Sequence, residues 1–143
     1  MTPLIKIDQI YFKREDQNIT GSAKDRAISV QLDTLIKQNY KEAVISSTGN
    51  AAISAQYFCD KFNIPLKIFV SSKTNPNKLK LLKNYTTSLK PVSDAFKYAK
   101  SNNAYLLRQS TDPIAQIGYS EISKEILNEL PQTTSIFVPV GSG

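Results

Sequence analysis

Short apolar runs alternate with longer amphipathic stretches along most of this chain. Apolar residues recur at spacings of three and four, which is typical of helices, in residues 25–38, 51–62, 75–84, 93–102 and 112–130. Compact apolar runs that favour strands occupy residues 4–7, 10–13, 43–47, 66–70, 87–89, 104–107 and 135–140. The runs at 43–47 and 66–70 are almost continuously apolar, as in strands buried on both faces. This alternation predicts an α/β fold with a parallel sheet covered by helices on both faces.

Composition narrows the chemistry that the chain can perform. The 143 residues are 41% hydrophobic and 21% charged, which is typical of a globular chain of one domain, or of one domain with part of another. Histidine is absent, which excludes Ser-His-Asp and Cys-His catalysis and nearly every histidine-based metal site, so no metal is expected. Cys59 is the single cysteine and falls on an apolar helix face, which predicts an inert core thiol in a cytoplasmic protein. No stretch is apolar over the ~20 residues that cross a membrane.

The net charge of +6 raises the question of an anionic partner. Only Lys73, Lys78, Lys80 and Lys83 are loosely grouped, and a solvated helix face explains such a cluster better than a nucleic-acid site does. We therefore expect no nucleic-acid partner, and we keep nucleic-acid binding as a distant alternative.

Lys24 is the first candidate for chemistry. It follows the Gly21 turn and opens the helix of residues 25–38, where Ser22 is predicted to cap the helix and Asp25 lies in the first turn. A buried lysine amine that loses its proton becomes a nucleophile able to form an imine with an aldehyde. The plain alternative is an ordinary solvated lysine at a helix start.

Two glycine-containing turns add to this candidate. Ser47, Thr48, Gly49 and Asn50 follow a predicted strand and open a helix, and the carboxyl ends of such strands are where open α/β sheets bind ligands. The second turn, after residues 135–140, is made of Gly141, Ser142 and Gly143. The alternatives are a helix N-cap for Asn50 and a flexible tail for the last three residues.

In this order the motifs resemble those of pyridoxal-phosphate enzymes of the tryptophan-synthase-β fold type, also called fold type II, and most closely threonine synthase. The family pattern Asn-Pro-Thr-Gly-Ser-Phe-Lys-Asp-Arg is similar to residues 18–26, which are Asn-Ile-Thr-Gly-Ser-Ala-Lys-Asp-Arg. The family's Ser-Thr-Gly-Asn is similar to residues 47–50, and residues 138–143 resemble the approach to its glycine-rich phosphate loop. Ile19 and Ala23 depart from the pattern, and Ala23 removes a large apolar side chain beside the lysine.

The resemblance implies a role for each matching residue. Lys24 would hold pyridoxal 5′-phosphate as an internal aldimine and move the substrate's α-proton. Asn50 would bind the hydroxyl of the cofactor ring. Three residues would bind the substrate carboxylate, namely Ser47, Thr48 and Gly49, and three would begin the phosphate cradle, namely Gly141, Ser142 and Gly143. Asp25 and Arg26 are expected to serve the helix end and an ion pair.

The resemblance also implies a division of the chain. Residues 1–40 would be the first segment of a large domain, residues 41–130 a small α/β domain, and residues 131–143 a return strand with the start of the phosphate loop, so that the chain is the amino-terminal portion of the family's fold. The expected function is a lyase of the threonine synthase or threonine/serine dehydratase class, acting on a small amino acid by β- or γ-replacement or elimination. The alternative is a truncated, inactive homologue that acts as a binding or regulatory module. A homo-oligomer or a partner supplying the rest of the fold is the expected assembly.

Overall fold

The computed structural model describes residues 1–139 and contains the predicted helices and, apart from the strand at 135–140, the predicted strands, in the predicted order. The strands are β1 (Leu4–Ile7), β2 (Ile10–Lys13), β3 (Glu42–Ser46), β4 (Leu66–Ser71), β5 (Tyr85–Ser88) and β6 (Ala104–Leu106). The helices are the 3-10 turn η1 (Glu15–Gln17), α1 (Lys24–Lys37), α2 (Asn50–Phe62), α3 (Pro76–Leu79), α4 (Pro91–Asn102) and α5 (Pro113–Glu129). The α3 helix is shorter than the predicted 75–84.

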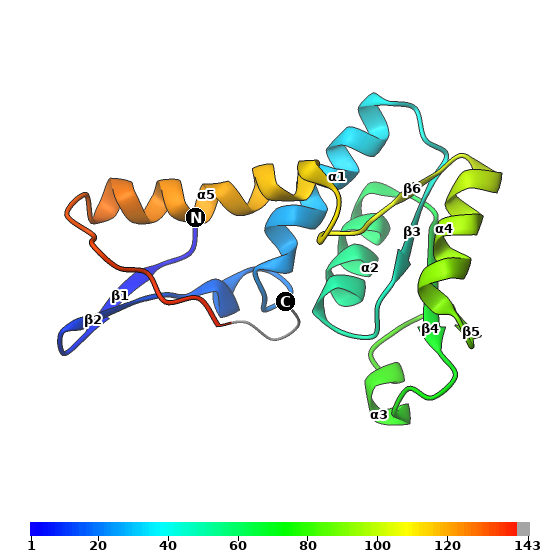
Figure 1. Ribbon diagram of the computed structural model, residues 1–143, viewed down its shortest axis with the longest axis horizontal. Coiled ribbons are helices and arrows are strands. Elements are labelled where there is room, and N and C mark those ends of the chain that lie inside the picture. The colour runs from blue at the N-terminus through cyan, green and yellow to red at the C-terminus, as the bar shows by residue number, and fades with distance from the viewer. Residues whose placement is uncertain (140–143) are drawn as a thin grey trace.

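A parallel four-stranded sheet in the order β5-β4-β3-β6 forms the centre of one half of the molecule (Figure 1). Helices α1 and α2 cover one face, and α4 covers the other. Successive side chains of β3 point to opposite faces of the sheet. Ala43 and Ile45 belong to the buried cluster under α1 and α2, whereas Val44 belongs to the buried cluster under α4. The predicted parallel sheet with helices on both faces is therefore confirmed.

The other half of the molecule is an antiparallel hairpin of β1 and β2 with α5 lying alongside it (Figure 1). Helix α1 stands between the halves and packs against α5 on one side and α2 on the other. The first residue of α1, Lys24, therefore lies where the two halves meet.

No helix in the described part of the chain has the length and apolar character needed to span a membrane.

The predicted strand at residues 135–140 is not found over residues 135–139, and Val140 lies outside the described residues. Ile136, Phe137 and Val138 are exposed, and Phe137 is 94% exposed. A strand requires a hydrogen-bonded neighbour, and no strand within residues 1–139 pairs with this segment. The apolar pattern of this segment is typical of a strand, but a sequence pattern does not show whether a neighbouring strand is present to pair with it.

Candidate functional site

The turn before α1 is built to present Lys24 at the start of the helix. Gly21 adopts a left-handed conformation with φ of +82°, which costs a glycine little. The Asp25 carboxylate accepts hydrogen bonds from the backbone N–H of Thr20, at 2.7 Å, and from the Thr20 hydroxyl. The structure places Ala23 at the N-cap, so the predicted cap by Ser22 is wrong in position, although its Oγ accepts a 3.3 Å hydrogen bond from the N–H of Lys24.

The Lys24 side chain is half-buried and is directed to α5. Its Nζ donates a 3.1 Å hydrogen bond to the hydroxyl of Tyr119 and lies 5.2 Å from the centroid of that ring. Tyr119 cannot be recognised from the sequence alone, because 95 positions separate it from Lys24 and no local pattern marks it. Lys24 is thus held by the side chain of Tyr119, whereas the alternative interpretation expected a lysine surrounded by solvent.

Arg26, two residues after Lys24, is the centre of a charge cluster between the halves of the fold. Its guanidinium donates to Glu15 of η1 at 2.7 Å and to Glu125 of α5 at 2.8 Å. Nζ of Lys13, on β2, also lies 2.7 Å from Oε2 of Glu125. The hydrogen bond from Arg26, with that from Lys13, lowers the pKa of Glu125 to about 2, although burial acts in the opposite direction. The predicted ion pair of Arg26 is confirmed, and it anchors the first turn of α1.

The second part of the site is the turn between β3 and α2. Gly49 is the N-cap of α2 and Asn50 is its first residue, so the alternative role of Asn50 as N-cap is wrong. Ser47 Oγ accepts a 3.3 Å hydrogen bond from the N–H of Gly49. No side chain among residues 1–139 caps α2, and a Cβ added at Gly49 would meet nothing within 4 Å. The N–H of Ala52 donates to the carbonyl oxygen of Gly49 at 2.9 Å, whereas the N–H groups of Asn50 and Ala51 have no acceptor among residues 1–139. Unpaired N–H groups at a helix start suit a carboxylate.

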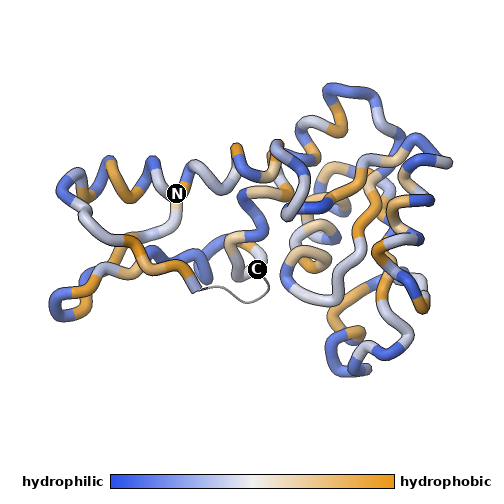
Figure 2. Tube along the Cα trace, in the orientation of Figure 1, coloured by the Kyte–Doolittle hydropathy of each residue, from blue (hydrophilic) through white to orange (hydrophobic). Residues whose placement is uncertain are grey.

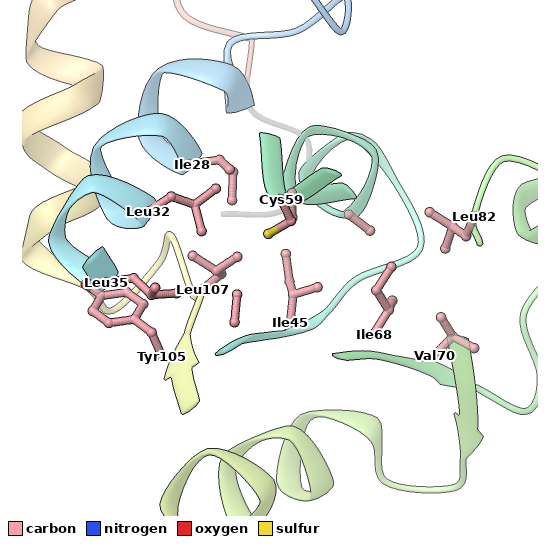
Figure 3. Close-up of a cluster of buried hydrophobic side chains, with 13 residues drawn as sticks. Ile28, Leu32, Leu35, Ile45, Cys59, Ile68, Val70, Leu82, Tyr105 and Leu107 are labelled. Atoms are coloured by element: carbon pink, nitrogen blue, oxygen red, sulfur yellow. The ribbon is translucent and has the colours of Figure 1, made fainter. Parts of the chain in front are cut away.

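A shared core joins the two parts of the site. Ile28 lies one helical turn after Lys24, Ala52 lies in the first turn of α2, and both belong to one buried cluster. Figure 3 shows Ile28 and Leu32 of α1 on the side of α1 that faces Cys59 of α2. The second turn of α1 and the first turn of α2 are thus packed into the same core. Gly141, Ser142 and Gly143 lie outside the described residues.

Cys59 contributes packing to this core, as predicted. It is 1% exposed, and burial raises the pKa of its thiol to about 12. A thiol in this state is a poor nucleophile, as expected of a cysteine that serves packing. Within the described residues no group of three or more acidic or cysteine side chains is arranged to hold a metal ion.

Comparison with known proteins gives a family match over the whole chain. Residues 1–143 match the family described as "Pyridoxal-phosphate dependent enzyme". The L-threonine ammonia-lyase of Geobacter sulfurreducens is 27% identical over 94% of this chain and 36% of its own length. The human L-serine dehydratase/L-threonine deaminase is 31% identical over 94% of this chain and 44% of its own length. The chain thus spans less than half the length of these curated relatives.

Solved structures agree on the fold. Maize serine racemase superposes with a TM-score of 0.79 at 20% identity, over 92% of this chain and 45% of the racemase chain. At this identity the superposition shows the fold alone, which is that of fold type II enzymes. Together with the family match over every residue, it shows that this chain belongs to the family of pyridoxal-phosphate-dependent enzymes, whose cofactor is pyridoxal phosphate.

Proposed function

We propose that the chain acts in a pyridoxal-phosphate-dependent lyase reaction that eliminates water from a hydroxy amino acid such as threonine or serine. The single observation that carries this proposal is the pairing of Lys24 at the start of α1 with the uncapped start of α2, on helices that share one core. The names of the two curated relatives support elimination. A replacement reaction like that of threonine synthase, which the motifs at residues 18–26 and 47–50 suggest, is the alternative reaction for the same site.

The residues present fit the cofactor. Lys24 offers a half-buried primary amine for covalent attachment. Asn50 is exposed at the start of α2 and is proposed to bind the hydroxyl of the cofactor ring. Gly141, Ser142 and Gly143 are proposed to begin the phosphate cradle with their backbone N–H groups. When bound, pyridoxal phosphate supplies an electron sink for the bond that breaks at the substrate's α-carbon.

The protein supplies binding, orientation and proton transfer. The hydroxyls of Ser47 and Thr48 and the backbone N–H groups that follow Gly49 are proposed to bind the substrate carboxylate. That contact would orient the α-carbon toward Lys24. Lys24 Nζ is proposed to take the α-proton and to deliver a proton to the departing hydroxyl group.

The test is titration of the purified chain with pyridoxal phosphate, followed by borohydride reduction and peptide mapping. We expect a saturable visible absorption band and a reduced adduct on Lys24. Lys24→Ala should lose both. Lys37→Ala is the matched control, since Lys37 closes the same helix, is exposed, and pairs only with Asp33 among the described residues. Unsaturable binding, or an adduct spread over many surface lysines, would overturn the proposal.

A second candidate function, a binding module, is favoured by one observation. An apolar cleft of about 470 Å³ opens between the hairpin, the end of α5 and residues 132–137, with Ile10, Phe12, Leu130 and Ile136 among its lining. A cleft of this kind suits another polypeptide, and a second copy of this chain is the simplest one. Sedimentation at rising concentration should show a dimer that Phe137→Asp abolishes, whereas a monomer at every concentration would contradict it.

A further inference from the structure

The contact between Lys24 and Tyr119 is made at the hydroxyl group of the tyrosine. That hydroxyl accepts a hydrogen bond from Lys24 Nζ at 3.1 Å, whereas the same nitrogen lies 5.2 Å from the ring centroid. The nitrogen therefore lies beyond the edge of the ring, and the oxygen lone pair is the group that holds it.

The backbone fixes the position of Tyr119. Its neighbour Gly118 lies so close to α1 that an added Cβ would stand 2.2 Å from the carbonyl oxygen of Arg26 and 2.9 Å from Cα of Ala27. Ala115, one turn earlier on α5, is fully buried. These small residues bring α5 against the first turn of α1, and the next residue along α5 is then placed beside Lys24.

We propose that Tyr119 is a positioning residue that holds the Lys24 amine against α5 until a carbonyl compound reaches it. This inference rests on the proposed role of Lys24 as the residue that binds the cofactor. To react, the amine must first leave the Tyr119 hydroxyl. The amine nitrogen then bonds to the carbonyl carbon, and water leaves as the C=N bond forms.

The hydroxyl of Tyr119 therefore slows the attack of Lys24 on a carbonyl group. Tyr119→Phe removes the hydrogen bond and keeps the ring. An ordinary hydrogen bond makes a modest net contribution, so its loss should accelerate the attack by about twofold to tenfold. Tyr119→Leu removes the ring as well and should give an acceleration at least as large.

The experiment is reductive methylation of the purified chain with formaldehyde and a mild borane, which needs no cofactor site. Peptide mass spectrometry follows the methylation rate of each lysine separately. We expect faster methylation of Lys24 in Tyr119→Phe and unchanged rates at the other lysines. Tyr98→Phe is the matched control, because it also removes a tyrosine hydroxyl that makes 3.1 Å hydrogen bonds, here as the donor to Glu42, but on α4.

The methylation rate of Lys13 shows whether the Tyr119 variants merely loosen the packing of α5. The Lys13 side chain is only 7% exposed and is held by Glu125 of the same helix, α5. If α5 merely loosened in the Tyr119 variants, Lys13 would be methylated faster together with Lys24, and the positioning role would be overturned. An unchanged or slower rate at Lys24 in both Tyr119→Phe and Tyr119→Leu would overturn it equally.

A second arm with pyridoxal phosphate and borohydride separates the two proposals. Faster methylation of Lys24 without a pyridoxyl adduct on Lys24 would support the role of Tyr119 and contradict the proposed function. An adduct on Lys24 with unaltered methylation in the variants would support the function and overturn the role of Tyr119.

Discussion

Gly118 lies where α5 packs tightly against the first turn of α1. Any side chain there would meet the backbone of Arg26 and Ala27, which belongs to a packed helix and has little freedom to move. Gly49 is the contrasting case, since its φ of −125° suits any residue and the space beside it is open. The two glycines thus serve different needs, one for close packing and the other for access to the start of α2.

We predict that Gly118→Ala lowers the free energy of unfolding by about 1–3 kcal/mol, because the helices must separate to admit a methyl group. Urea denaturation followed by circular dichroism measures the change. Gly49→Ala is the matched control and should change the free energy of unfolding by less than about 1 kcal/mol. Equal effects at the two positions would show that α1 and α5 are not in tight contact.

At the scale of elements, the ion cluster ties four segments of the chain together. Lys13 belongs to β2, Glu15 to η1, Arg26 to α1 and Glu125 to α5. Burial opposes the ionisation of Glu15, but hydrogen bonds from Arg26, Thr2 and Asn18 lower its pKa overall. Because Arg26 lies two residues after Lys24, the same cluster also fixes the turn of α1 that carries Lys24.

Glu125 makes the stability of the protein depend on acid pH. Its pKa is lowered from the ordinary 4.5 to about 2 in the folded protein, so the charged carboxylate stabilises the fold at pH values above 4.5. That contribution is lost progressively as the pH falls from 4.5 towards about 2.

We predict that Glu125→Gln lowers the free energy of unfolding by about 1–3 kcal/mol at pH 7, because Arg26 and Lys13 lose a charged partner. The variant should also lose part of the decline in stability between pH 4.5 and about 2. Denaturation at several pH values tests both effects. Glu121→Gln, on the same helix and in an exposed 2.6 Å pair with Lys124, should change stability by less than about 1 kcal/mol; an equal effect there would contradict a special role for the cluster.

At the scale of the whole molecule, the two halves differ in how fully their apolar residues are covered. The parallel sheet has buried clusters on both faces. In the other half, exposed apolar stretches occur in the hairpin and at residues 136–138 (Figure 2). Residues of the hairpin line the apolar cleft together with Ile136 and Phe137. A two-stranded hairpin has little stability without such cover.

We predict that backbone amides of β3 and β4 exchange with solvent deuterium at least a hundredfold more slowly than those of β1 and β2. The central strands open only when the buried clusters come apart, whereas the hairpin opens locally. Hydrogen exchange followed by mass spectrometry of peptides measures the difference. Similar protection of Ile5 and Ile45 would show that the hairpin is as firmly held as the sheet.

The sequence by itself determined the order of the elements, the parallel sheet with its two covered faces, and the choice of Lys24 and residues 47–50 as candidates. These features are local, because the periodicity of apolar residues and the chemistry of turns act within a few positions. The short α3 and the unpaired segment at 135–139 show the limit of such patterns: helix length and strand pairing depend on what packs alongside.

Only the tertiary structure decided which side chain holds Lys24, where Arg26 finds its acids, and why position 118 is glycine. Tyr119 and Glu125 lie more than ninety positions from their partners in α1, and only the folding of α5 back against α1 makes them neighbours. The physical reason is that hydrogen bonds, ion pairs and close packing act over a few ångströms in space, whatever the separation along the chain. The candidate residues are thus visible in the sequence, while the contacts that hold them exist only in the fold.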